Sequence, residues 1–173
     1  MKTQSMLLLA AAFLCAATPS FVKAEDAKKS SLNTADEKFV KTAAQSGMAE
    51  VKIAELGVQK AQRAEVKELA QMMVKDHTEV NTQLKGLAKT KGVELSAVVD
   101  ADAVDTFKGL EKQSGADFDK EFLATLEKHH KETIAAYEDA EKESKDNDLT
   151  LWVTKTLPSL RGHLDKVKSL EGK

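Results

Sequence analysis

Four long stretches of the 173-residue chain carry apolar residues at steps of three and four, and this periodicity constrains the fold more than any other feature. Such spacing places the apolar residues on one face of an α-helix. The chain has only two prolines, and alanine, leucine, glutamate and lysine are abundant, which favours helices over strands. The predicted helices cover approximately residues 34–62, 64–91, 117–145 and 149–170. We therefore predict an all-α fold.

The connections between these helices predict how they are arranged. The first two helices, and likewise the last two, are joined by short turns, whereas residues 93–114 form a long connection. Within it, Val104, Phe107 and Leu110 give a short amphipathic helix with one apolar face. Because short turns join antiparallel neighbours, the sequence predicts an antiparallel four-helix bundle. Its connectivity is ferritin-like, with a long helical crossover between the second and third helices.

Signals at helix ends refine this prediction. Thr34 followed by Glu37 is typical of a capping box at the start of the first helix. Gly92 is expected to end the second helix. Pro158 lies inside the fourth helix and should bend it one turn before His163.

The N-terminal residues predict export. Lys2 precedes an uncharged apolar run, Met6 to Ala17, which is too short to span a membrane. Val22-Lys23-Ala24 then forms a small-x-small cleavage site. We expect a signal peptide at residues 1–24, a flexible linker at 25–33 and the helical bundle at 34–171, in a protein of the periplasm. The alternatives are an uncleaved N-terminal anchor and a lipid on Cys15.

Cleavage would change the composition in ways that exclude several functions. It removes Cys15, the single cysteine, and with it any disulfide, thiol catalysis or Cys-bound zinc. Loss of Lys2 and Lys23 lowers the 26 basic side chains to 24, against 28 acidic ones, which leaves a net charge of −4 with histidine neutral. Mixed charges of this kind offer no basic face for nucleic acid. No later segment could span a bilayer, so any association with the membrane would be peripheral.

Each of the four long helices carries one ionisable side chain on its apolar face. These residues are Glu50, His77, His130 and His163. At 1.5 Å per residue, the first two lie about 20 Å from the turn between their helices and the last two about 25 Å from theirs. With the turns at opposite ends of a bundle about 43 Å long, all four share one layer near its middle.

A layer of one glutamate and three histidines is a donor set that suits a divalent transition metal such as zinc, copper or iron. Glu50, His77, His130 and His163 are therefore the ligands that we predict for any metal that the protein binds. The alternative is a hydrogen-bonded polar layer that fixes the register of the helices. The line of apolar residues along one face of a helix is called its seam. His129 lies at the edge of the seam of its helix and Asp76 is expected to face solvent, so we predict no functional role for either.

Five segments follow one another in an order and spacing typical of one bacterial family. They are GMAEV at residues 47–51, MMVKDHT at 72–78, LKGLAKTKGVEL at 84–95, Phe118-Asp119 followed by His130, and LPSLRGHL at 157–164. In these segments the chain resembles the exported "domain of unknown function 4142" family of ferritin-like bundles, whose members are often labelled outer membrane proteins. The resemblance covers about residues 34–171. It implies the fold, export and the same glutamate and three histidines, but no activity.

The wider ferritin-like group includes di-iron proteins, which use paired carboxylates and two Glu-x-x-His motifs. Here only Glu127 and His130 have that spacing. Val74 and Leu160 occupy the corresponding positions before the other two histidines. Two bridging carboxylates are therefore missing from the pattern, which argues against a di-iron oxidase or an iron store.

Three functions stay open from the sequence. We expect first a non-catalytic structural or stress-related protein of the envelope. The second is a metal-binding bundle with a Glu/His₃ site, used in metal handling or redox protection, and the last is a metalloenzyme. The chain has no Ser-His-Asp set, phosphate loop or dinucleotide fingerprint, so we predict no catalytic residue.

Overall fold

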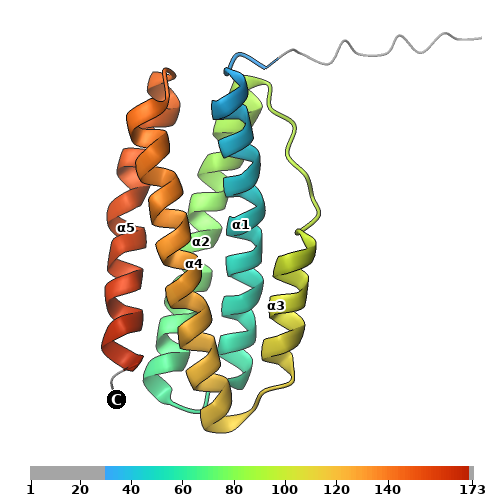
Figure 1. The fold of residues 1–173 in the computed structure, drawn as a ribbon, viewed down its shortest axis with the longest axis vertical. Coiled ribbons are helices and arrows are strands. Elements are labelled where there is room, and N and C mark those ends of the chain that lie inside the picture. Colours follow the sequence, from blue (N-terminus) through green and yellow to red (C-terminus); the bar gives the residue numbers. More distant parts are fainter. Residues whose placement is uncertain (1–29, 172–173) are drawn as a thin grey trace, which may run out of the picture.

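A computed structural model describes residues 30–171, which form five helices (Figure 1). The helices are α1 (Thr34–Lys60), α2 (Ala64–Lys91), α3 (Ala101–Glu111), α4 (Gly115–Glu143) and α5 (Asn147–Glu171). No strand occurs in this part of the chain, so the prediction of an all-helical fold is confirmed. The predicted signal peptide and the first five residues of the predicted linker lie outside the described residues. Among the helices described, none combines the length and hydrophobicity that a membrane span requires.

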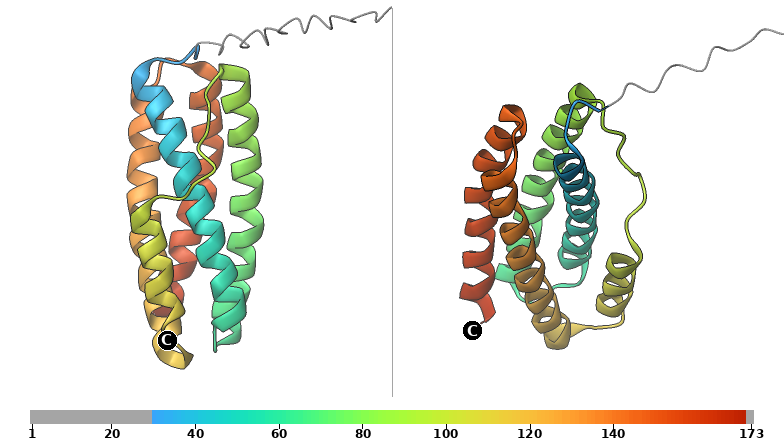
Figure 2. Two further views of the ribbon diagram at one scale, coloured as in Figure 1. Left: turned by 90° about the vertical axis from the view of Figure 1, so that its right-hand side faces the viewer. Right: turned by 45° about the horizontal axis from the view of Figure 1, so that its top comes forward.

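The four long helices run side by side, and the two turns that join them in pairs lie at opposite ends (Figure 1). Helix α1 packs mainly against α2, and α4 against α5, while contacts of α1 with α4 and of α2 with α5 complete the bundle. After α2 the chain returns along the outside of the bundle to α3, which lies against α1 and α4 (Figure 2). The long connection therefore covers one side of the bundle.

The start of α1 differs from the prediction. Its N-cap is Asn33, whose Oδ1 accepts a hydrogen bond from the Asp36 N–H at 2.9 Å. The capping box at Thr34 and Glu37 is therefore wrong, because Thr34 is already the first helical residue and Glu37 pairs with Lys41 instead. An asparagine at this position satisfies one of the free N–H groups of the first turn as well as threonine would.

The turn between α1 and α2 is held by the other pair of helices. Buried Asp119 of α4 accepts hydrogen bonds from the backbone N–H groups of Gln62, at 2.9 Å, and Arg63, at 2.8 Å. The Arg63 guanidinium in turn donates to the Leu170 carbonyl of α5 at 3.0 Å. Both carboxylate oxygens of Asp119 are thus used to fix the end of one helix pair on the other.

The small residues of α1 let its neighbours approach closely. A Cβ placed on Gly57 would lie 2.4 Å from Cζ of Phe122 and 2.9 Å from Cβ of Ala70, both of which are closer than real Cβ contacts. A Cβ on Gly47 would lie 2.0 Å from Oδ1 of Asn81. At Gly57 the neighbours are a buried ring and a methyl group fixed on its helix, so space requires glycine there, whereas at Gly47 the amide of Asn81 would have to turn away.

Buried apolar side chains form two separate clusters. The cluster near the α1–α2 turn includes Ile53, Met73 and Leu126, and the cluster near the α4–α5 turn includes Val40, Leu84 and Leu160. Along each of the four long helices, the ionisable residue on the apolar face comes between the members of one cluster and those of the other. The middle of the core is therefore polar.

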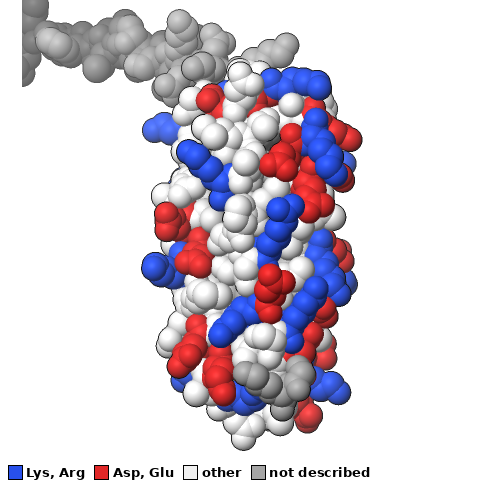
Figure 3. Space-filling model, turned by 90° about the vertical axis from the view of Figure 1, so that its left-hand side faces the viewer, with Lys and Arg blue, Asp and Glu red and all other residues white. Residues whose placement is uncertain are grey.

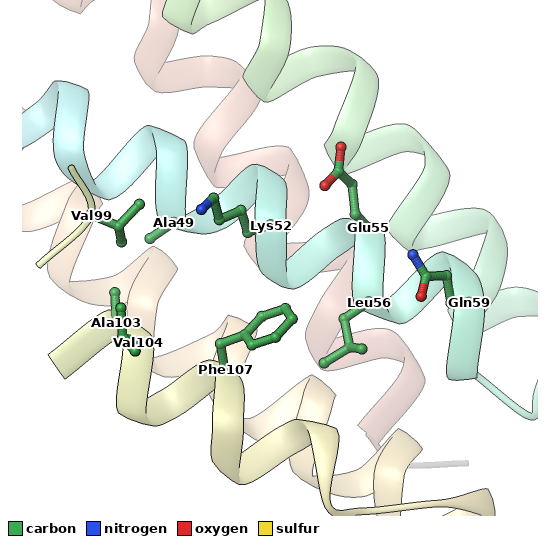
Figure 4. Close-up of a pocket in the computed structure, with 9 residues that line it drawn as sticks. All are labelled: Ala49, Lys52, Glu55, Leu56, Gln59, Val99, Ala103, Val104 and Phe107. Atoms are coloured by element: carbon green, nitrogen blue, oxygen red, sulfur yellow. The ribbon is translucent and has the colours of Figure 1, made fainter. Parts of the chain in front are cut away.

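Helix α3 is packed less completely than the long helices. Leu110 is buried, but Val104 is 39% exposed, so the predicted apolar face of this helix is only partly covered. A groove of about 400 Å³ lies between α1 and α3, with Leu56 and Phe107 approaching each other across it (Figure 4). On the side of the molecule where α5 lies, acidic and basic side chains alternate over the surface (Figure 3).

Candidate metal centre

Three histidines from three helices meet in the middle of the bundle. His77 comes from α2, His130 from α4 and His163 from α5, and at most 4% of each residue is exposed. Their ring centroids are 5.2–5.5 Å apart. One ring nitrogen from each can be chosen so that all three lie within 4.8 Å of one another. Separations of this size bring three donor atoms within reach of one metal ion.

The tautomer of His130 follows from its backbone partner. Its Nδ1 lies 2.9 Å from the Leu126 carbonyl oxygen, one turn earlier in α4. A carbonyl can only accept a hydrogen bond, so Nδ1 must carry the proton. In the neutral ring, Nε2 is then left with a free lone pair, and this nitrogen points toward the other histidines.

His163 is oriented by a carboxylate. Its Nε2 lies 3.0 Å from Oδ2 of Asp76 on α2, with Oγ of Ser159 at 3.4 Å. Because an ionised carboxylate only accepts, Nε2 of His163 carries the proton and Nδ1 presents the lone pair. The expectation that Asp76 lies toward solvent is wrong, since its side chain is two-thirds covered and reaches α5.

The two free nitrogens face each other. Nε2 of His130 and Nδ1 of His163 are 3.4 Å apart, and in the neutral rings neither has a proton to share. Two nitrogens bound to one tetrahedral metal ion at roughly 2.0–2.1 Å lie about 3.3 Å from each other. These two histidines therefore fit a metal ion both in the separation of their nitrogens and in the direction of their lone pairs.

His77 completes the group as a neutral ligand. The pKa of His77 is lowered to about 4, mainly by burial and to a smaller extent by the neighbouring His130 and His163, against the opposing effect of Glu50. Its Nε2 is buried and has no hydrogen-bond partner. An orphaned nitrogen in a core costs free energy, and a bound cation would remove that cost. Burial also lowers the pKa of His130, so this ring too is neutral near pH 7.

Glu50 is buried next to the histidines but turns toward a different partner. Its Oε1 lies 3.4 Å from Nδ1 of His129, while its Oε2 is buried without a partner. It does not belong to the group of atoms within 4.8 Å that the three histidines form. Burial raises the pKa of Glu50, but the hydrogen bond from His129 and the electrostatic effect of the surrounding imidazole rings together lower it below its usual value.

His129 has a role that the sequence did not indicate. The hydrogen bond with Glu50 raises the pKa of His129 against the effect of burial. Its position at the edge of the α4 seam faces α1, where Glu50 lies. Glu127, which has the Glu-x-x-His spacing with His130, instead pairs with Lys131 at 2.8 Å. The Glu127 carboxylate therefore forms an ion pair with Lys131 and does not take part in the histidine group.

Comparisons with known proteins give a family and a fold. The model of a family described as "Domain of unknown function (DUF4142)" matches residues 22–170. No curated protein matches the chain. Among solved structures, a DUF305 fragment from Deinococcus radiodurans superposes with a TM-score of 0.73 at 14% identity, over 82% of this chain and 97% of the fragment.

Two further solved structures share the fold at low identity. CopM in the Cu(I)-bound form superposes with a TM-score of 0.63 at 20% identity, over 78% of this chain and 94% of CopM. A conserved hypothetical protein from Mycobacterium tuberculosis gives 0.62 at 13% identity, over 80% of this chain and 91% of that protein. CopM has also been solved with Cu(II) and with silver. At these identities the likeness shows the helical fold alone.

Proposed function

The chain belongs to the family described as "Domain of unknown function (DUF4142)", a description that assigns no activity, and we propose from the site that it binds one transition metal ion. The ligands are His77, His130 and His163, each through one ring nitrogen. Glu50 lies beside them and supplies negative charge to the same layer. Glu50 was predicted as a fourth ligand, and that role stays a prediction.

One observation carries this proposal: the 3.4 Å approach of two imidazole nitrogens whose protons are both committed elsewhere. In a purely structural layer, one ring would be expected to donate a hydrogen bond to the other. Here the Leu126 carbonyl and the Asp76 carboxylate direct both protons away from the centre. The arrangement of a carboxylate behind a histidine is also the one that orients ligands in metal sites.

The nature of the metal follows from the ligands. Neutral imidazole suits copper, zinc and iron, and three such ligands add no charge to the ion they bind. Copper is our first choice, because CopM, which shares the helical fold, has been solved in Cu(I)-bound and Cu(II)-bound forms. When bound, the metal supplies a cation that three rings hold in common, and the activity is storage or transfer of that ion without catalysis.

Export and a ferritin-like bundle belong to the same proposal. The predicted signal peptide would place the protein in the periplasm. The turns at opposite ends of the bundle and the long crossover between α2 and α4 support the ferritin-like, antiparallel four-helix classification.

Equilibrium binding tests the function directly. Protein purified without an affinity tag and stripped of metal is titrated with Cu⁺, Cu²⁺ and Zn²⁺ against chelators of known affinity. We expect one ion per chain, with a Kd below roughly 1 μM. His77→Ala, His130→Ala and His163→Ala should each weaken binding at least tenfold, and X-ray absorption of the loaded protein should show nitrogen ligands.

Thr156→Val is the matched control, because it also removes a buried polar group from α5. Thr156 is 4% exposed and donates to the Trp152 carbonyl, away from the histidines. It should bind metal like the wild type. If no metal binds more tightly than roughly 1 μM, the metal function is refuted, and the histidine layer is the structural device that the sequence offered as the alternative.

A further inference from the structure

An open cavity of about 500 Å³ lies where α1, α3 and α4 meet. Asp100 and Asp102 at the start of α3 and Glu132 on α4 contribute carboxylates to its wall, and Lys128 is the lysine among the lining residues. We call this cavity the acidic vestibule. All three acids are exposed, and Asp100 is also the N-cap of α3, accepting from the Ala103 N–H at 2.8 Å. The vestibule therefore presents negative charge to solvent.

The floor of the acidic vestibule is the buried carboxylate beside the histidines. Glu50 and its partner His129 both line the vestibule. Glu50 also lines a second, internal cavity of about 10 Å³, and His77 lines the same internal cavity. A volume of this size holds about one water molecule or one ion. Ser46, Glu50 and Thr133 line both cavities, and Glu50 is the charged side chain among these three, between the solvent-facing cavity and the small cavity beside His77.

The Glu50 carboxylate has an unused acceptor in this position. Glu50 is only 4% exposed, and its Oε2 has no hydrogen-bond partner. A buried, unpaired carboxylate oxygen is costly, and the ligand that removes the cost best is a cation. An acidic rim alone is common on protein surfaces, but this rim leads to an unsatisfied anion that borders the histidine layer.

We infer that the acidic vestibule is the path by which a metal cation reaches His77, His130 and His163, with Glu50 as the carboxylate that takes the ion from solvent and passes it to the histidines. This inference rests on the proposed metal binding. The carboxylates of the rim raise the local concentration of cations and so the rate of association, an effect that ionic strength suppresses. The unpaired Glu50 oxygen provides an intermediate ligand between the rim and His77.

The test measures how fast the metal-free protein takes up Cu²⁺ at low ionic strength. Quenching of Trp152, the single tryptophan, reports uptake in a stopped-flow instrument. The triple variant Asp100→Asn, Asp102→Asn, Glu132→Gln removes the charge of the rim, and asparagine at position 100 keeps the N-cap. Its control is Glu65→Gln, Glu68→Gln, Glu171→Gln, which removes three exposed charges from α2 and α5.

We expect the vestibule variant to bind Cu²⁺ about tenfold more slowly than the control at low ionic strength, and this difference to shrink at high salt. Glu50→Gln should slow uptake at both salt concentrations, because it removes the intermediate ligand itself. Equal rates for the vestibule variant and the control would overturn the path while leaving the histidine site intact. Failure of the wild type to bind Cu²⁺ at equilibrium would instead refute the proposed function, and the path with it.

Discussion

Nε2 of His130 and Nδ1 of His163 face each other across 3.4 Å, and in each ring the proton is on the other nitrogen, which donates it in a hydrogen bond on the far side of the ring. The partners differ: His130 uses a carbonyl of its own helix, whereas His163 uses the Asp76 carboxylate of α2. One ring is therefore set by local helix geometry and the other by a contact between helices. This difference makes the Asp76 contact the easier of the two to change by mutation.

Asp76→Asn should weaken metal binding by about 10- to 100-fold, the usual cost of losing a carboxylate behind a histidine ligand. The amide lacks the charge of the carboxylate that accepts the Nε2–H of His163 and so stabilises this tautomer. Competition with a chelator measures the affinity. Asp165→Asn, an exposed acid of α5, is the control and should leave the affinity unchanged. An Asp76→Asn protein that binds as tightly as the wild type would contradict this role.

The metal-free protein should lose stability as the pH falls from about 6.5 to 4. His77 takes up a proton near pH 6.5 in the unfolded chain, but only at about 4 in the folded protein. Stability from this group is therefore fully present above the unfolded pKa and is lost as the pH falls toward the folded one, by up to about 3 kcal/mol.

Urea denaturation at a series of pH values measures this loss. Other groups also titrate in the range, Glu50 among them, so the comparison is between the wild type and His77→Asn. The variant should show a shallower decrease in the free energy of unfolding between pH 6.5 and 4. Parallel curves for the two proteins would show that His77 is protonated equally in the folded and unfolded states.

Gly57→Ala should destabilise the bundle by about 1–3 kcal/mol, because the added methyl group would overlap Phe122 and Ala70. Gly86→Ala on α2 is the matched control. No atom lies within 4 Å of the Cβ it would add, so the alanine should stabilise the helix by about 0.5–1 kcal/mol. Chemical denaturation should show a lower free energy of unfolding for Gly57→Ala and a higher one for Gly86→Ala than for the wild type. A neutral Gly57→Ala would mean that α1, α2 and α4 can move apart at no cost.

Asp119→Ala should lower the free energy of unfolding by about 3 kcal/mol, since it leaves two backbone N–H groups of the α1–α2 turn without their charged acceptor. Asp119→Asn should cost about half as much, because one oxygen atom remains. Thermal and urea unfolding measure the loss, with Glu121→Ala, an exposed residue of α4, as the control. Equal stabilities for Asp119→Ala and Glu121→Ala would rule out the anchor.

Periodicity alone was enough to predict the buried side of each long helix. Glu50, His77, His130 and His163 stand on the predicted seams and all four are buried. The reason is physical: an apolar stripe has only one favourable orientation toward a core, so every residue within it is carried inward. The fold class follows from the same rule. That a metal binds among these four residues stays a prediction.

Partners at the edges of the seams could not be predicted in this way. Asp76 and His129 each neighbour a buried histidine in sequence, which turns them by about 100° around the helix axis. Whether such an edge position meets solvent or another helix depends on which helices are adjacent and how each is rotated. The seam pattern gives neither the neighbours of a helix nor its rotation. It therefore predicts that Asp76 faces solvent, although Asp76 contacts α5, and it predicts no role for His129, although His129 contacts Glu50.

The polar layer has a consequence for how the protein opens. Each half of the bundle has its own apolar cluster, and the layer interrupts the contacts between them. We therefore expect each half to unfold locally as a separate cooperative unit. An ion held by α2, α4 and α5 would join the two units where the apolar contacts are interrupted. Amide hydrogen exchange should then show one cooperative opening free energy for the metal-loaded protein and two different ones for the metal-free protein.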